Sequence, residues 1–421
     1  MLRSCSHATE IRTLSAETVI TGLGTIGCYG HGREALAAAL AEGRPVVSEV
    51  DFCAGLHREG GARLAALVGE RDVSRWVSPA AARRMSVPSK LVVAAARMAL
   101  AEAGIDATRD GSPCVGVYLS TTFGSGLSTE RLLRQILLEG AEAAQPFHFS
   151  ECVANAPAAQ LAIAVGARGP NVTLTQRESG PLLAVARGAQ AVREGRVDLA
   201  LVGAVEEVTP LLHALLDRFG ALATKEGALA EMPRPFDRRR NGFLAGEGAT
   251  VLTLEREEAA QARGARVLAR VAWSGAAFDA TAPVSDWGDG HAPLAAVLRA
   301  GLDEEPGGAA GVGAVVSGAS GARRGDRIEA LVLRAAWGEA PLPPVLVPKA
   351  VIGEYGGGIL APGLLALEGA HFGPPHGFAE SDPTAGVTPH RGGARQIPSR
   401  VLLTGLAAGG AAAWLLLERA S

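Results

Sequence analysis

Five cysteines are the side chains in this sequence best suited to nucleophilic, redox or metal chemistry. They are Cys5, Cys28, Cys53, Cys114 and Cys152. No two of them form a Cys-x-x-Cys pair, and no histidine stands near them at a spacing typical of zinc ligands. The sequence also lacks a Gly-Lys-Ser/Thr phosphate loop and the full strand, glycine turn and helix fingerprint of dinucleotide sites. We therefore expect free, buried thiols in a reducing compartment, and neither a metal nor a nucleotide cofactor.

Glycine-rich motifs carry most of the recognisable pattern in the chain. A single glycine cluster usually marks a tight turn that needs a positive φ angle. Here four motifs occur in order: Val19-Ile20-Thr21-Gly22-Leu23-Gly24; Asn155-Ala156-Pro157-Ala158-Ala159-Gln160 followed by Gly169-Pro170-Asn171-Val172-Thr173; Arg234-Pro235-Phe236-Asp237 followed by Gly242-Phe243 and Gly246-Glu247-Gly248-Ala249; and Gly409-Gly410 before Leu415-Leu416-Leu417-Glu418-Arg419. The third motif is the most specific, because charged and aromatic residues accompany its glycines.

The elements that must position these motifs follow an alternating pattern. Short β-branched runs alternate with alanine-rich segments of helical periodicity, which is typical of layered α/β proteins with buried strands. Strands are predicted over residues 18–21, 115–120, 171–175 and 199–202, and again near 249–255, 266–275, 312–317, 344–349 and 399–404. Helices are predicted over 33–42, 88–103, 157–165, 181–194, 209–216, 291–302 and 327–336. The chain therefore divides into two similar halves, which we place at residues 17–255 and 256–421.

Composition and charge narrow the class of protein further. The chain has 421 residues, of which 48% are hydrophobic and 20% charged, as expected for a compact protein with a large core. Its net charge of −3 provides no field for nucleic acid. Residues 1–17 contain no apolar run, and the apolar stretch 402–417 is interrupted by Gly405, Gly409 and Gly410. We therefore expect a cytoplasmic protein with no membrane span and with an irregular surface segment at residues 371–396.

In this order, the four motifs resemble those of the β-ketoacyl synthase branch of the thiolase superfamily. The resemblance runs from Val19 to Arg419. It implies a thiolase-like duplicated αβαβα layered sandwich with two five-stranded mixed sheets, in a protein that is nearly always dimeric. A condensing member of the family needs a cysteine thiolate to carry the acyl chain. It also needs two histidines, which help to decarboxylate the malonyl extender and polarise its carbonyl.

All three catalytic groups of a condensing enzyme are replaced in this chain. On the family's nucleophile segment, residues 171–180 place Glu178 where the cysteine belongs. Gly318 stands in place of the first histidine. Glu354, five residues after the retained Lys349, stands in place of the second. A carboxylate cannot form the thioester intermediate, so the resemblance predicts no residue that catalyses condensation. The loop that gates the acyl pocket reads Ala408, Gly409 and Gly410, with Ala408 in place of a phenylalanine.

A preserved scaffold without its catalytic groups is similar to a chain-length factor. That subunit pairs with an active ketosynthase and lines the acyl tunnel in type II polyketide, including polyene, or fatty-acid-like biosynthesis. Its nucleophile is usually replaced by Gln, so Glu178 is a departure. The resemblance implies an acyl carrier protein as second partner, with phosphopantetheine only as the carrier's arm. It also implies tunnel and interface residues: Phe123, His148, Leu132, Leu133, Ile136 and Leu137. Core packing is the alternative for the leucine and isoleucine residues.

Two other functions stay open at this point. Glu178 and Glu354 could meet beside Lys349 as an acid–base pair for malonyl-carrier decarboxylation or proton transfer, because paired carboxyl groups split their pKa values. A helix N-terminus should instead hold Glu178 ionised as a structural anion. The third function is a homodimeric acyl-binding protein. Two arginine clusters are candidate docking sites for an acidic carrier protein: Arg238, Arg239 and Arg240, and Arg323 with Arg324.

Overall fold

The structure is a computed structural model that describes residues 17–69, 73–106 and 114–420. Its strands are β1 (Thr18–Gly27), β2 (Gly30–His31), β3 (Ser48–Glu49), β4 (Leu64–Ala65), β5 (Val115–Ser120), β6 (Asn171–Leu174), β7 (Leu199–Glu206), β8 (Gly248–Arg256), β9 (Ala269–Phe278), β10 (Ala314–Val316), β11 (Val345–Leu346), β12 (Arg400–Leu406) and β13 (Ala411–Glu418). Its α-helices are α1 (Arg33–Glu42), α2 (Pro79–Ala82), α3 (Val87–Ala103), α4 (Gly126–Glu139), α5 (Pro146–Glu151), α6 (Ala156–Val165), α7 (Gly180–Arg193), α8 (Pro210–Arg218), α9 (Glu257–Ala262), α10 (His291–Asp303), α11 (Arg323–Trp337), α12 (Lys349–Ile352) and α13 (Leu360–Leu367). All predicted strands and helices are therefore present, with shifted ends.

The main sheet consists of two halves that repeat the same strand order. The first half runs β6-β5-β7-β8-β1 and the second runs β11-β10-β12-β13-β9. In each half the first three strands are parallel, and the other pairs are antiparallel. Two residue pairs, Val19 with Arg270 and Ile20 with Ala269, join β1 to β9. The two predicted five-stranded sheets are therefore present, but they meet edge to edge and form one continuous sheet.

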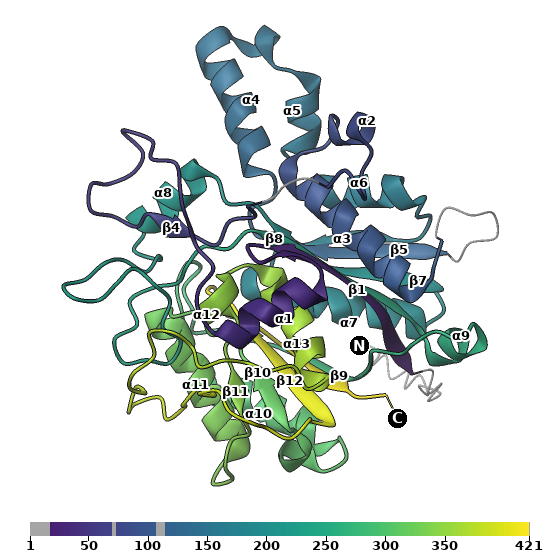
Figure 1. Cartoon of the computed structure of the whole chain (residues 1–421), viewed down its shortest axis with the longest axis vertical. Coiled ribbons are helices and arrows are strands. Elements are labelled where there is room, and N and C mark those ends of the chain that lie inside the picture. Colours follow the sequence, from purple (N-terminus) through teal and green to yellow (C-terminus); the bar gives the residue numbers. More distant parts are fainter. Residues whose placement is uncertain (1–16, 70–72, 107–113, 421) are drawn as a thin grey trace, which may run out of the picture.

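Helices cover and separate the two halves of the sheet (Figure 1). Helices α3 and α6 cover the outer face of the first half, and α10 and α11 cover the outer face of the second. Helices α7 and α13 lie between the halves, where Val185 and Leu364 share one apolar cluster with Val202 and Leu415. Burial of these apolar side chains stabilises the stack, at about 25 cal/mol per Å² removed from water. The predicted αβαβα sandwich is confirmed.

Glycines of the opening motif allow α3 to lie directly on β1. A Cβ atom at Gly22 would collide with the carbonyl oxygen of Ala99, and one at Gly24 would collide with that of Ala95. The whole run from Gly22 to Gly27 lies inside the strand, away from any strand-to-helix turn. These glycines therefore serve helix-on-sheet packing and do not form a phosphate loop.

The Arg-Pro-Phe-Asp motif connects the two halves of the chain. Phe236 is fully buried with a φ of 61°, and its backbone N–H donates to Asp326 of α11 at 2.9 Å. Asp237 accepts hydrogen bonds from the Arg239 side chain at 2.8 Å and from Ala379 N–H at 2.7 Å. Burial alone would raise the pKa of Asp237, but these hydrogen bonds hold it below its usual range. The motif thereby anchors the irregular segment 371–396, which contains no helix or regular strand.

The apolar stretch near the C-terminus forms a β-hairpin. Residues 402–417 form the hairpin of β12 and β13 around the double glycine, and no described helix is long and apolar enough to cross a membrane.

Of the five cysteines, Cys5 lies outside the described residues. The other four cysteines form no disulfide, and burial raises the pKa of Cys28 to about 12. The expectation of buried thiols was wrong: Cys28, Cys53 and Cys152 are half-buried, and Cys114 is exposed because it stands before the first residue of β5.

Candidate functional site

The turn between β6 and α7 is the strand-to-helix turn of the nucleophile segment. After Leu174 the chain makes a short 3-10 turn, Arg177–Ser179, and α7 begins at Gly180. Arg177 has a φ of 48°, a left-handed conformation that is strained for a residue with a Cβ atom. A strained residue at a strand-to-helix turn is typical of nucleophile elbows. The geometry therefore puts Arg177 at the elbow, with Glu178 as the next residue.

A buried cluster of three carboxyl groups and one ammonium group lies beside this turn. Lys349 is fully buried, and its Nζ lies 2.5 Å from Oε1 of Glu354. Glu178 is close enough to both that their charges act on its carboxyl group. The fourth member is Glu329 of α11, which is buried and on which the charge of Lys349 also acts. The structure thus brings Glu178, Lys349 and Glu354 together and adds Glu329, a residue that the sequence analysis missed.

The carboxyl group of Glu178 has a raised pKa. Burial raises the pKa of Glu178 to about 7, and the negative charge of Glu354 adds to this rise while Lys349 opposes it. Its Oε2 atom is buried and has no hydrogen-bond partner among the described residues. Desolvation therefore outweighs the favourable helix N-terminus, and the expectation of a firmly ionised Glu178 was wrong.

Replacing Glu178 by glutamine should stabilise the protein at alkaline pH and leave it unchanged in acid. The folded-state pKa of Glu178 is raised, so the stability of its neutral form is fully present below the ordinary glutamate pKa and is lost as the pH rises through about 7. We expect Glu178→Gln to gain roughly 1–3 kcal/mol over the wild type at pH 8 and almost nothing at pH 4.5. Urea unfolding at both pH values measures this difference. Glu139→Gln, at an exposed position on α4, is the control. An equal gain at both pH values would refute the assignment.

The position of the first missing histidine is closed by backbone. Gly318 N–H donates to Glu329 Oε1 and to Thr404 Oγ1, both at 3.1 Å. A Cβ atom at Gly318 would lie 2.7 Å from the carbonyl oxygen of Thr404. Any side chain here requires β12 to shift, so an imidazole does not fit the structure as it stands.

The loop that gates the acyl pocket in the family lies against the same turn. Gly409 and Gly410 have φ values of 91° and 96°, which form the tight connection between β12 and β13. The Arg177 guanidinium donates to the carbonyl oxygen of Ala408 at 3.1 Å. Residue 408 of this loop is an alanine, so no bulky side chain stands at that position. The loop is held instead by a hydrogen bond from the elbow.

The predicted tunnel and interface residues gather at the opposite end of the molecule from α10. Helices α4 and α5, which we call the arm (residues 126–151), project beyond the sheet at the top of Figure 1. On α4, Leu132 is buried, whereas Leu133, Ile136 and Leu137 are exposed, Leu137 by 80%. Core packing therefore explains Leu132 alone. Other large apolar residues exposed nearby are Leu138, Phe149, Val153 and Ile163.

Phe123 is held at the base of the arm by a buried glutamate. Phe123 is 50% exposed, and its backbone N–H donates to Glu206 Oε2 at 3.3 Å. Thr122 N–H donates to the other carboxyl oxygen of Glu206, at the end of β7. Burial raises the pKa of Glu206 to about 7, although these hydrogen bonds oppose the rise. His148 of α5 is half-buried, and its ring lies 5.2 Å from that of Phe147.

The arginine clusters proposed for carrier docking are largely engaged inside the protein. Arg239 pairs with Asp237, and Arg240 is buried and pairs with Asp382 at 2.9 Å. Arg238 alone of the three is exposed, in an ion pair with Glu380. The interpretation of these three arginines as one basic docking patch was therefore wrong. The second cluster is more exposed, but Arg324 pairs with Asp286 at 2.5 Å and Arg323 lies 3.7 Å from Glu226.

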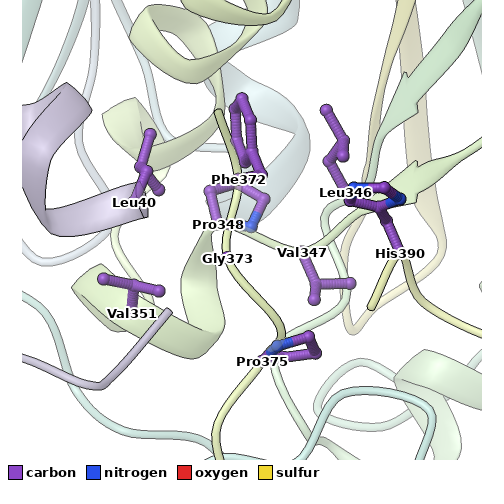
Figure 2. A pocket seen from close by; sticks show the side chains of 9 residues that line it. All are labelled: Leu40, Leu346, Val347, Pro348, Val351, Phe372, Gly373, Pro375 and His390. Atoms are coloured by element: carbon purple, nitrogen blue, oxygen red, sulfur yellow. The ribbon is translucent and has the colours of Figure 1, made fainter. Parts of the chain in front are cut away.

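Glu178, Lys349 and Glu354 do not line either of two small cavities found in the described part of the molecule. Each has a volume of about 10 Å³, which is room for one water molecule. Figure 2 shows the first, with His390 at its edge and otherwise apolar lining residues: Leu40, Leu346, Val347, Pro348, Val351, Phe372, Gly373 and Pro375. Within the described residues, no three His, Cys, Asp or Glu side chains are placed to hold a metal ion.

Similarity to known proteins agrees with this architecture. Residues 16–260 match the family model described as Beta-ketoacyl synthase, N-terminal domain. The 3-oxoacyl-[acyl-carrier-protein] synthase 2 of Vibrio cholerae is 30% identical over 335 residues, which cover 78% of this chain and 79% of the relative. The actinorhodin polyketide putative beta-ketoacyl synthase 1 of Streptomyces coelicolor is 30% identical over 388 residues, covering 89% of this chain and 82% of the relative.

A solved structure extends the similarity to the whole fold. The ishigamide ketosynthase/chain length factor superposes with a TM-score of 0.85 at 29% sequence identity, and the match covers 96% of this chain and 100% of that chain. The duplicated five-layer sandwich is thus shared over 96% of this chain. Since the family model alone spans more than half of the sequence, this chain belongs to the β-ketoacyl synthase family.

Proposed function

We propose that this chain is the non-condensing, chain-length-factor-like subunit of a polyketide synthase. It pairs with an active ketosynthase and contributes one wall of the acyl tunnel. The observation that carries this proposal is a family fold whose elbow holds Arg177 and Glu178 beside carboxyl groups and one lysine. Neither a thiol nor an imidazole belongs to that cluster. Cys28, whose Sγ lies 3.9 Å from the Ile352 carbonyl oxygen, has a pKa raised to about 12 and stays protonated.

An uncovered surface supports pairing with a second chain. β6 ends the strand order, so its outer edge has no neighbouring strand among the described residues. Helix α6 packs beside β6, and α5 packs against both α4 and α6, so the edge continues into the apolar arm. Exposed strand edges and contiguous apolar side chains are normally covered by a partner. Leu133 and Leu137 on α4 and Ile163 on α6 would pack into that interface.

The names of the similar proteins support the kind of complex. One similar structure is a ketosynthase/chain length factor, and one relative is a putative polyketide β-ketoacyl synthase. Another relative is named 3-oxoacyl-[acyl-carrier-protein] synthase 2. We propose that an acyl carrier protein delivers the chain by its phosphopantetheine arm, and that the subunit itself needs no bound cofactor. The same complex implies a cytoplasmic location.

Co-expression with the intact ketosynthase of the same gene neighbourhood tests the proposal. We expect a one-to-one complex by size exclusion with mass analysis. The complex should condense malonyl-carrier only while the partner's cysteine is intact. This chain alone should not condense. A stable homodimer that does not exchange with the ketosynthase would favour the homodimeric acyl-binding function instead.

Replacing Phe123 by alanine should lengthen the products of that complex. The ring is half exposed in the single chain, and the proposed tunnel wall would lose its volume in the variant. We expect the main product to shift by at least one extension unit, measured by mass spectrometry of the released chains. Phe219→Ala is the control, because Phe219 is also an exposed ring, by 81%, and follows α8. An unchanged length distribution in Phe123→Ala would remove this residue from the tunnel.

The carboxyl cluster keeps one alternative function open. Glu178 has a pKa near 7 and an unpartnered oxygen, as an acid–base catalyst would require. The alternative predicts that the isolated chain releases carbon dioxide from malonyl-carrier, and that Glu178→Gln and Glu354→Gln each abolish the release. No release above background would exclude it.

A further inference from the structure

One side chain connects the elbow to the gate loop. Arg177 Nη1 donates to the carbonyl oxygen of Ala408 at 3.1 Å. The neighbouring residues of the loop are fixed from the other side, because Gly409 N–H donates to the Asp286 carbonyl oxygen at 2.9 Å and Asp279 N–H donates to that of Gly410 at 2.7 Å. Fixed donors and acceptors thus hold all three gate residues.

The elbow and the gate strand are also in direct backbone contact. A Cβ atom at Gly405 of β12 would lie 2.7 Å from the carbonyl oxygen of Glu178. Only a glycine allows this approach, which places the end of β12 on the turn. The left-handed φ of 48° at Arg177 directs its side chain from this turn to the loop. A strained backbone of this kind persists only where the surrounding contacts enforce it.

We propose that Arg177 keeps the gate loop closed over the buried carboxyl group of Glu178, so that carrier-bound acyl groups do not reach it. It holds the gate loop by its guanidinium. Arg177 acts through Ala408 and is therefore a positioning residue. Closure has a consequence that rests on the proposed function. Acyl loading and chain extension then take place on the ketosynthase partner.

A cysteine reporter inside the pocket tests the closure in the full-length chain. The variant Glu178→Cys places a thiol directly behind Arg177, and peptide-resolved mass spectrometry separates its alkylation from that of the native cysteines. We expect N-ethylmaleimide to modify Cys at 178 about fivefold to tenfold faster when Arg177→Gly is added, as for the loss of one hydrogen bond. Glycine is chosen because it adopts the left-handed φ without strain. Arg177→Lys, which keeps a donor, should restore part of the protection.

Two controls separate closure from general loosening. Arg187→Gly changes another arginine, on α7, and should not alter the reporter rate. Labelling of the exposed Cys114 gives a reference rate within each sample. Amide exchange over residues 405–411 should also accelerate in Arg177→Gly. Equal reporter rates with and without Arg177 would overturn the proposal. This outcome does not depend on heterodimer formation, which is measured separately by size exclusion.

Discussion

The double variant Leu133→Asp with Leu137→Asp should no longer form a complex with the ketosynthase. Both residues lie on the same face of α4, one turn apart, and both are exposed in the single chain. Two carboxylates buried against an apolar partner surface would each cost at least about 2 kcal/mol, or roughly 30-fold in Kd. Sedimentation velocity with purified subunits measures the loss. Condensation activity should disappear in parallel.

The matched control is Val297→Asp on α10. Val297 is 40% exposed, against 50% for Leu133, but α10 lies at the opposite end of the molecule from the arm (Figure 1). This variant should bind the ketosynthase as the wild type does. Unimpaired binding by the arm variant would contradict the interface. The chain would then have to bury another surface.

Replacing Lys349 by methionine should destabilise the protein strongly. The ammonium is fully buried and carries the only positive charge of the cluster formed by Glu178, Glu329, Glu354 and Lys349. Its removal leaves the Glu354 carboxylate without its counter-charge. Removing one partner of a buried ion pair lowers the free energy of unfolding by about 3–5 kcal/mol. Urea unfolding at pH 8 should show a loss of this size.

The double variant Lys349→Met with Glu354→Gln distinguishes a charge effect from a packing effect. Because glutamine at position 354 carries no charge, most of the lost stability should return. Acid should also rescue the single variant, because the pKa of Glu178 is about 7 and its protonation removes a second negative charge. A single variant as stable as the wild type would show that the cluster is open to water.

The fold was predictable because its strands are continuous β-branched runs and its motifs occur in the family's order. Residues 115–120, for example, are predicted as a strand and observed as β5 with all six residues buried. The joining of the two sheets was not predictable, since only two residue pairs between β1 and β9 create it. The helix α13 was also missed, because it is apolar on every side and shows no period.

The site was predictable in part. Lys349 and Glu354 are five residues apart in one segment and form the predicted neighbours of Glu178. Arg177 was missed because a left-handed φ at a non-glycine residue leaves no signal in the sequence. Glu329 was missed because its contact to Thr404 of β12 spans 75 residues of sequence, and its contact to Ser317 joins α11 to the end of β10. The prediction of a docking patch at residues 238–240 was wrong, because the sequence does not show which guanidinium groups are buried.

The crowding of Gly318 by the Thr404 carbonyl bears on how this subunit evolves. A histidine at position 318 would need room that the backbone does not leave, since its Cβ atom would lie 2.7 Å from the Thr404 carbonyl oxygen of β12. Such a substitution should disturb the packing before it supplies any chemistry. The same lineage would also need a thiol at the elbow and a second histidine at position 354. Under the proposed function, no single substitution would therefore turn this chain into a condensing enzyme.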